Sequence, residues 1–249
     1  MPGDLITYLR GSRQKTLDRT SSASSFANIY YSGTTYSLWR AAAEPTAEHC
    51  KGLVLGAGSG RGALKEIIER RATRESVDVA PKAEEQVTWV ADLTNMPQVP
   101  ADRYDAAICH QVLEHVLDPA AALAELERVL KPGGMLIVSV PHLSRQHELP
   151  HDYFRFTPAG LEKLLSTAGL ELVSVRTYGG ICTFVHHQFS TLILEIAAII
   201  YPLRILLVAL NSPFSVFSAV LDHVLDRNGL LANGVLAVAR KHFEGSLDA

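Results

Sequence analysis

The chain has 249 residues, of which 47% are hydrophobic, so it has enough apolar side chains for a buried core and is not disordered throughout. Its formal net charge of -3 provides no basic surface of the kind that binds a phosphate backbone, and we expect no nucleic-acid partner. Cys50, Cys109 and Cys182 lack CxxC spacing, and no signal-peptide core follows the first charged residues. These features predict a reducing, cytoplasmic location.

Residues 1–45 precede the first regular pattern of the chain. They contain a Ser/Thr-rich run and the tyrosines Tyr30, Tyr31 and Tyr36, and they lead to a short predicted helix around Trp39. No periodic apolar pattern marks a core in this stretch. We therefore expect an N-terminal cap over residues 1–45 and one larger domain over residues 46–249.

Strands and helices alternate from residue 52 onward. The predicted strands are 52–56, 77–79, 87–90, 104–109, 135–140, 170–178 and 233–241, and the predicted helices are 61–70, 119–130 and 157–169. The last two helices begin with Asp118-Pro119 and Thr157-Pro158, which supply an N-cap side chain and a proline at the first helical position. This alternation predicts a parallel sheet with helices on both faces.

The first predicted strand runs into the glycine-rich loop "LGAGSGRG", residues 55–62. Glycines let a backbone approach a ligand closely, and the start of the following helix presents free amides to a negative group. A dinucleotide-binding loop has a third glycine at the position that Arg61 occupies here. The loop therefore disfavours a nicotinamide-dependent oxidoreductase.

Five segments in order resemble the class I S-adenosyl-L-methionine (SAM) dependent methyltransferases. They are "LVLGAGSGRG", "VDVAP", "ADLTNMP", "YDAAICHQVLEHVLDP" and "LERVLKPGGMLIVSVP". The resemblance implies a Rossmann-like α/β sheet, mostly parallel, with seven strands of which the last is antiparallel. It also implies SAM as cofactor and S-adenosyl-L-homocysteine as product. Val54 departs from the pattern, because many relatives carry an acidic residue there.

The resemblance also assigns cofactor contacts. Asp78 would accept hydrogen bonds from the ribose hydroxyls, at close to the offset of about 20 residues known from the dinucleotide unit. Asp92 would bind the adenine amino group, and Leu93 would line the pocket for the ring. The expected cofactor-binding residues are Gly56, Ala57, Gly58, Gly60, Asp78, Val79, Asp92, Leu93 and His110.

Two histidine-containing segments compete for the acceptor side of the reaction. A hydroxyl acceptor must be aligned with the methyl group and must lose its proton, and histidine suits that task. One segment, "HQVLEHV", follows the strand 104–109, and the other is the polar loop "PHLSRQHELPHDYFRFT", residues 141–157. The expected catalytic residues are His115, His147 and His151.

Structural roles are the alternatives for these residues. Glu114 and His115 would then brace the helix behind the strand, and His147 and His151 would belong to an exposed polar loop. Some relatives bind a divalent metal through E-x-x-E-H and a later histidine. Gln111 replaces the first acid of that motif, so we expect no metal.

The phrase "HDYFRFTPAGLEKLL" is similar to one in methyltransferases of bacterial cell-surface glycan and natural-product pathways. This likeness favours O-methylation of a sugar, a glycan or another small molecule. The tyrosines of the cap and Trp39 would close over SAM and the acceptor. The alternative is a SAM-binding, catalytically weak scaffold or membrane-associated partner protein.

A helical apolar insertion, residues 185–230, precedes the last strand. Residues 192–210 are nearly long enough to cross a bilayer, but Glu195, Pro202 and Arg204 and the return of the chain to the sheet make a single span improbable. Three functional alternatives remain for residues 189–226: peripheral contact with the inner face of the membrane, a homodimer interface, and a lid. Plain packing on the sheet is the structural alternative.

Overall fold

A computed structural model describes residues 33–58, 64–80, 87–199, 204–226, 229 and 231–243. The chain divides into two compact units. The first, here called the sheet unit, comprises Ala41–Tyr178 and Asn233–Ala249; the second, the helical unit, comprises Met1–Arg40 and Gly179–Ala232. The helix α3 (Gly33–His49) runs from one unit into the other, so the predicted short helix around Trp39 is longer than expected.

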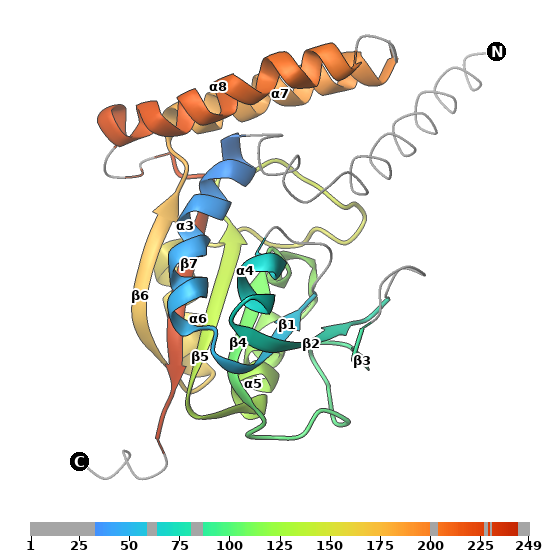
Figure 1. Cartoon of the computed structure of the whole chain (residues 1–249), viewed down its shortest axis with the longest axis vertical. Coiled ribbons are helices and arrows are strands. Elements are labelled where there is room, and N and C mark those ends of the chain that lie inside the picture. The colour runs from blue at the N-terminus through green and yellow to red at the C-terminus, as the bar shows by residue number, and fades with distance from the viewer. Residues whose placement is uncertain are drawn as a thin grey trace, which may run out of the picture. The chain divides into compact units, whose positions relative to one another are not determined.

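The sheet unit contains a seven-stranded sheet in the order β3-β2-β1-β4-β5-β7-β6 (Figure 1). Its strands are β1 (Gly52–Ala57), β2 (Ala72–Asp78), β3 (Trp89–Val90), β4 (Tyr104–His110), β5 (Leu130–Pro141), β6 (Leu170–Tyr178) and β7 (Gly234–Lys241). The pairs among β1 to β5 are all parallel, whereas β7 lies antiparallel between β5 and β6. The predicted fold class, a mostly parallel sheet whose last strand is antiparallel, is confirmed.

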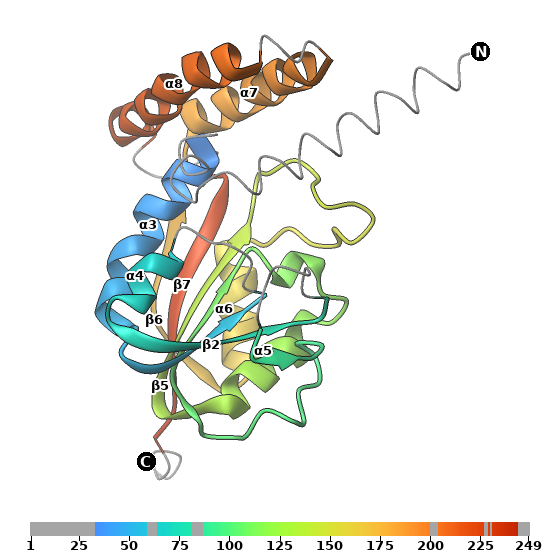
Figure 2. The same ribbon diagram turned by 45° about the vertical axis from the view of Figure 1, so that its right-hand side comes forward.

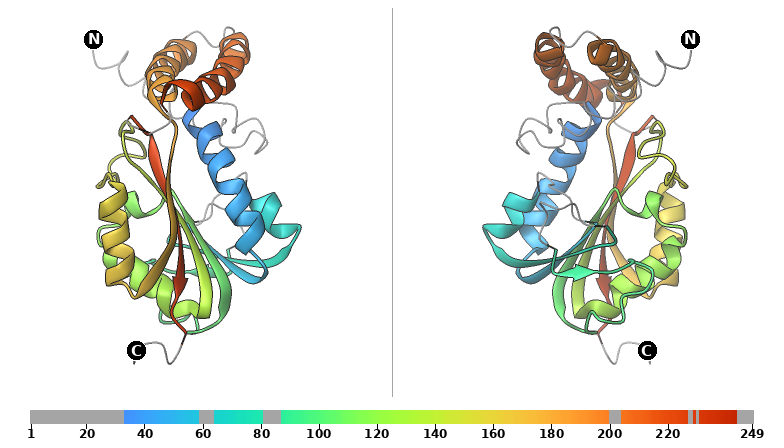
Figure 3. Two further views of the ribbon diagram at one scale, coloured as in Figure 1. Left: turned by 90° about the vertical axis from the view of Figure 1, so that its left-hand side faces the viewer. Right: turned by 90° about the vertical axis from the view of Figure 1, so that its right-hand side faces the viewer.

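Helices cover both faces of this sheet. The helices α5 (Pro119–Val129) and α6 (Pro158–Thr167) lie on one face, and α4 (Lys65–Glu69) lies with residues 41–49 of α3 on the other (Figures 2 and 3). Asp118 caps α5 by accepting from the N–H groups of Ala120 and Ala121, and Thr157 caps α6 by accepting from the N–H of Gly160. Both caps satisfy helix-terminal donors, as the sequence predicts.

The segment after α5 differs from the prediction. The residues "KPGG" were expected to follow the end of a helix and to precede a strand that begins at 135, but β5 already begins at Leu130. Its pairing with β4 is irregular between Tyr104 and Ala106. Gly133 has a φ of 78°, and a Cβ on Gly134 would lie 2.8 Å from the carbonyl oxygen of Lys131. The two glycines thus form a bulge inside a strand, which local sequence does not distinguish from a turn.

The carboxyl ends of the parallel strands meet at one edge of the sheet. Ala57 pairs with Val77 and with Cys109, and Asp78 pairs with Val90. Ligands of open α/β sheets bind outside this edge. The glycine loop, Asp78 and the exit of β4 are therefore neighbours in the fold.

The helical unit contains the antiparallel helices α7 (Ile181–Ile199) and α8 (Arg204–Leu225), which lie side by side in each view (Figures 1 and 3). In the described part of the chain, none of the helices combines the length and the hydrophobicity that crossing a bilayer requires.

Candidate active site

The glycine loop begins with a tight turn at Gly58. Its φ is 59°, a conformation that favours glycine, and its N–H donates to the carbonyl oxygen of Val77 at 2.9 Å. A Cβ at this position would lie 2.6 Å from a methyl carbon of Val112. The first turn of the loop is therefore packed directly against the exit of β4. Gly60 and Arg61 lie outside the described residues.

Two carboxylates lie at the ends of the neighbouring strands β2 and β3. Asp78 ends β2, and its Oδ1 accepts from the N–H of Ala80 at 3.0 Å. Asp92 follows β3, and its Oδ1 accepts from the N–H and the hydroxyl of Thr94 at 2.9 and 2.8 Å. The N–H of Ala91 donates to the carbonyl oxygen of Asp78, which holds the two segments together. Neither carboxylate is buried, so both remain accessible to the hydroxyl and amino groups of a nucleoside.

The other expected cofactor contacts have different surroundings. Val79 is 66% exposed beside Asp78, whereas Leu93 is only 7% exposed and packs in the hydrophobic core. His110 is enclosed, with Nδ1 3.0 Å from the Ser139 hydroxyl on β5, and burial lowers its pKa to about 4. It is therefore neutral at pH 7 and supplies no positive charge.

The chain leaves β4 through a strained residue. Gln111 has a φ of 53°, its N–H donates to the carbonyl oxygen of Ser139, and its side-chain amide donates to the hydroxyl of Tyr178 at 3.0 Å. A non-glycine residue held in this conformation by such contacts is frequent at functional sites. The turn directs Val112 toward Gly58 and begins the short 3₁₀ helix η1 (Leu113–His115). Sequence reasoning missed Val112 and Tyr178, because neither contact has a local signature.

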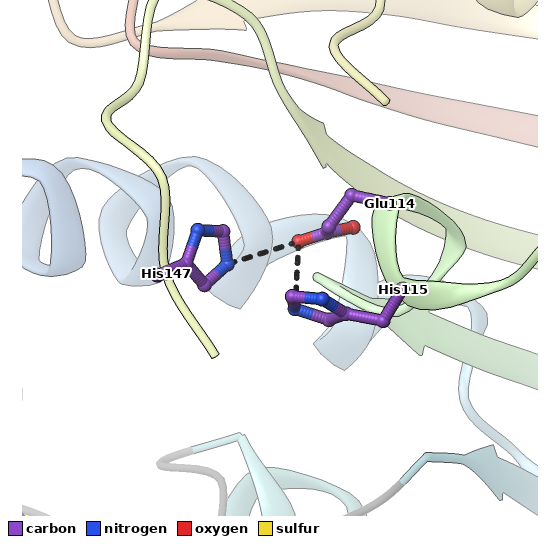
Figure 4. A group of neighbouring side chains, drawn as sticks. All are labelled: Glu114, His115 and His147. Atoms are coloured by element: carbon purple, nitrogen blue, oxygen red, sulfur yellow. Dashed lines mark ion pairs between the residues drawn. The ribbon is translucent and has the colours of Figure 1, made fainter. Parts of the chain in front are cut away.

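Glu114 is the centre of a side-chain cluster at this exit (Figure 4). Its side chain is fully buried, and neither of its carboxylate oxygens receives a hydrogen bond from the described residues. The Nε2 atoms of His147 and His115 lie 3.5 and 3.8 Å from its Oε1. The two imidazole rings meet edge to face, 4.8 Å apart. A buried carboxylate of this kind requires a positive partner or a proton.

The loop between β5 and α6 is anchored so that His147 reaches Glu114. The Arg155 guanidinium binds both oxygens of Asp152, at 2.6 and 2.8 Å, and it holds the pKa of that carboxyl well below its usual range. Asp152 also accepts from the N–H of His147 at 2.9 Å, and the N–H of Tyr153 donates to the carbonyl oxygen of Glu114. These bonds join the two histidine-containing segments into one site.

The structure brings two of the three predicted catalytic histidines to Glu114. The imidazole of His151 instead lies 2.8 Å from the hydroxyl of Tyr153, and it is exposed. Its carbonyl oxygen lies 2.5 Å from Nδ1 of His115. That contact places a proton on Nδ1 of His115 and leaves its Nε2 directed toward Glu114.

The cluster has the electrostatics of an acid–base site. Burial lowers the pKa of His147, but Glu114, the carbonyl oxygen of Arg145 and the charge of Asp152 together outweigh it, so that the pKa is raised above the ordinary value of 6.5. A histidine whose pKa is raised in this way holds a proton more strongly than a free imidazole and can act as an acid–base group. One ligand atom each from Glu114, His115 and His147 also lies within 4.8 Å of the others, so the same residues could hold a metal ion.

The first residues of the glycine loop and the strand ends fit SAM. Gly58 is exposed and carries no side chain because Val112 fills the space beside its Cα, and the carboxylates of Asp78 and Asp92 are suitable acceptors for ribose hydroxyls and an amino group. The order of the sheet together with this arrangement defines a class I, Rossmann-like methyltransferase fold.

Comparisons with known proteins agree with this class. A family model described as a methyltransferase domain matches residues 37–175, more than half of the chain. The chain therefore belongs to the class I SAM-dependent methyltransferase family.

Similar proteins match over part of their length. A ubiquinone biosynthesis O-methyltransferase of Neisseria meningitidis serogroup A is 25% identical, over 52% of this chain and 68% of its own. A "Probable S-adenosylmethionine-dependent methyltransferase" of Mycolicibacterium smegmatis is 32% identical, over 51% and 55%. The solved structure of the [4+2]-cyclase SpnF has 20% identity and a TM-score of 0.54, over 82% of this chain and 80% of that one. The last likeness concerns the fold alone.

Replacing Asp78 with Ala is expected to weaken SAM binding by about 1.5 to 3 kcal/mol, because a charged hydrogen-bond acceptor for the ribose is lost. Isothermal titration of SAM into the purified protein measures this effect. Glu171→Gln changes a carboxylate on β6 that pairs with Arg240, and it serves as the matched control. An unchanged dissociation constant in Asp78→Ala would remove this carboxylate from the binding site.

Proposed function

We propose that the protein transfers a methyl group from SAM to a hydroxyl group of a small molecule, with His147 as the base. The observation that supports this is the buried carboxylate of Glu114 beside the Nε2 atom of His147. A proton taken up at that nitrogen creates an imidazolium next to a carboxylate that has no hydrogen bond among the described residues. The pair thus gains most from its charge interaction when the acceptor has lost its proton.

The residues at this edge of the sheet would have separate roles in binding the cofactor and the acceptor. The Gly58 turn, Asp78 and Asp92 would hold SAM, which supplies an electrophilic methyl group when bound. Val112 packs on the Gly58 turn and lies two positions before Glu114 in sequence, so one short segment links the cofactor loop to the carboxylate that pairs with the base His147. His115, fixed at Nδ1 by the carbonyl oxygen of His151, would orient the acceptor or share its proton at Nε2.

Two resemblances support a hydroxyl acceptor. Several curated relatives are named O-methyltransferases of ubiquinone biosynthesis, and the phrase at residues 151–165 resembles one from glycan and natural-product pathways. We therefore propose O-methylation of a small molecule with a phenol-type or sugar-type hydroxyl. A reducing, cytoplasmic location, with residues 189–226 at a membrane surface or in a homodimer, is part of the same proposal.

Cofactor titration and methyl-transfer assays together test this function. SAM and S-adenosyl-L-homocysteine are expected to bind, NAD is expected not to bind, and labelled SAM is expected to methylate a member of a panel of catechols and glycosides. Heat from NAD alone would overturn the assignment. SAM binding without transfer to any hydroxyl, amine or thiol acceptor would instead favour the catalytically weak scaffold.

A further inference from the structure

Among the described side chains of α7 and α8, most polar residues lie inside and the most exposed large residues are apolar. The buried residues described on the two helices are all polar or small: Thr183, His187, Ser190, Asn211, Ser215, Ser218, Ala219 and Asp222. The exposed large hydrophobic residues on them are Ile181, Val185, Phe189, Leu192, Leu206, Leu210, Phe214, Phe217, Val220, Val224 and Leu225. Surface helices of proteins in water show the opposite distribution.

Lipid reverses this preference. Helices that pack in a membrane place small and polar residues between them and direct aliphatic and aromatic residues toward the acyl chains, because burying apolar surface gains nothing there. On α8 the buried residues 211, 215, 218 and 222 recur at helical spacing, as do 183, 187 and 190 on α7. The two helices therefore have the pattern of a pair whose surroundings are apolar.

Two aspartates at the end of α8 accept hydrogen bonds from the free N–H groups at the start of α7. Asp222 on α8 accepts from the N–H groups of Cys182 and Thr183, at 2.7 and 3.1 Å, and Asp226 accepts from the N–H of Ile181 at 3.0 Å. A helix end without such partners is costly in lipid, where no water replaces them. These bonds also direct both carboxylates away from the outer face.

Among the side chains that the structure describes, the outer face formed by the exposed residues of both helices carries no carboxylate, lysine or arginine. Besides apolar side chains, it contains only Gln188 and, near the end of α8, His223 among the described side chains. None of these described side chains except His223 could carry a charge that selects a headgroup or a charged protein partner. The face is complementary to neutral acyl chains.

We propose that the pair α7–α8 inserts its outer face into one leaflet of a lipid membrane. The apolar arc of α8 includes neighbouring positions such as Pro213 with Phe214 and Val224 with Leu225, and it is broader than the narrow seam that joins two helices in water. This breadth favours lipid over a second copy of the chain. The pair lies in the leaflet as an interfacial anchor, and acceptors dissolved in lipid become concentrated near the enzyme.

Flotation with uncharged phosphatidylcholine vesicles tests the proposal on the full chain. The protein is expected to float with the vesicles at both low and high salt, because no headgroup charge is involved. Phe214 and Phe217 are 60% and 62% exposed. The double variant Phe214→Ser/Phe217→Ser is expected to lower the partition coefficient of the protein into the vesicles by about tenfold or more. The matched control is Val173→Ser/Val175→Ser, which changes two exposed valines of β6 and should float like the wild type.

A second measurement distinguishes insertion from adsorption and from self-association. In the variant Phe217→Trp, phosphatidylcholine with brominated acyl chains is expected to quench tryptophan fluorescence more than in the wild type, which has only Trp39 and Trp89. Sedimentation without lipid is expected to show a monomer. A dimer that the Phe214→Ser/Phe217→Ser variant dissociates, with no flotation, would overturn the proposal and assign the face to a second copy. Equal flotation of the two double variants would also overturn it.

Discussion

Replacing His147 with Gln is expected to lower kcat for methyl transfer by about 100- to 10,000-fold, the usual contribution of a positioned base. The dissociation constant of SAM should stay unchanged, because the loop that carries His147 is separate from Gly58 and Asp78 in sequence and contacts Glu114 instead. Labelled SAM with an acceptor from the hydroxyl panel measures kcat, and titration calorimetry measures the affinity.

The control is His242→Gln, which changes an exposed histidine just after the end of β7. Chelation of metal ions provides a second arm, because Glu114, His115 and His147 have suitable donors for a cation. We expect activity to survive chelation. A loss that added Mg²⁺ or Mn²⁺ restores would show that the cluster holds a metal ion and that His147 is a ligand rather than the base.

The pH profile of the same reaction follows from the electrostatics of the pair. His147 must be neutral to accept a proton, so kcat/KM should rise with pH through a midpoint above 6.5, the ordinary value that Glu114 raises. Glu114→Gln removes the charge and leaves burial, which lowers the pKa of His147, so the midpoint should move to lower pH. Titration of the His147 ring by NMR reports the same shift without an acceptor. A midpoint that the substitution leaves in place would contradict the pairing.

Replacing Gly58 with Ala is expected to destabilise the sheet unit and to weaken SAM binding together. The left-handed backbone costs about 1 to 2 kcal/mol for an alanine, and the collision of its Cβ with Val112 adds about 1 to 3 kcal/mol. Relief of this collision must move either the glycine turn or the exit of β4. Urea unfolding measures the stability, and calorimetry measures the affinity for SAM.

Gly169 offers a matched control for the cost of a left-handed backbone conformation. Its φ is 81°, but no atom lies within 4 Å of the Cβ that an alanine would add. Gly169→Ala should therefore lower the free energy of unfolding only by the cost of the left-handed backbone. The double variant Gly58→Ala/Val112→Ala should recover part of the lost SAM affinity, because the smaller side chain makes room for the new methyl group. Equal effects of Gly58→Ala and Gly169→Ala on stability and SAM affinity would show that the contact with Val112 has no role.

Most elements of the sheet unit were predictable because their signals are local, although β2 begins at Ala72 and not near Val77 as predicted. The caps at Asp118 and Thr157 and the apolar strand before the glycine loop depend on neighbours within a few residues in the chain. The bulge at Gly133 and Gly134 was not predictable, since the same residues also end helices, and only the pairing of β5 with β4 decides between the two.

By itself, the sequence determined the order of strands and helices, the glycine loop, the acids at the ends of β2 and β3, and the class of reaction. Only the tertiary structure decided which histidines meet Glu114, that Val112 packs on Gly58, and that α7 and α8 turn their polar residues inward. Periodicity and turn chemistry are properties of adjacent residues, whereas a cluster that joins residues 114 and 147 depends on how the anchored loop returns to the sheet. The face that a helix buries depends on what surrounds it, and an apolar run in the sequence is compatible with either face.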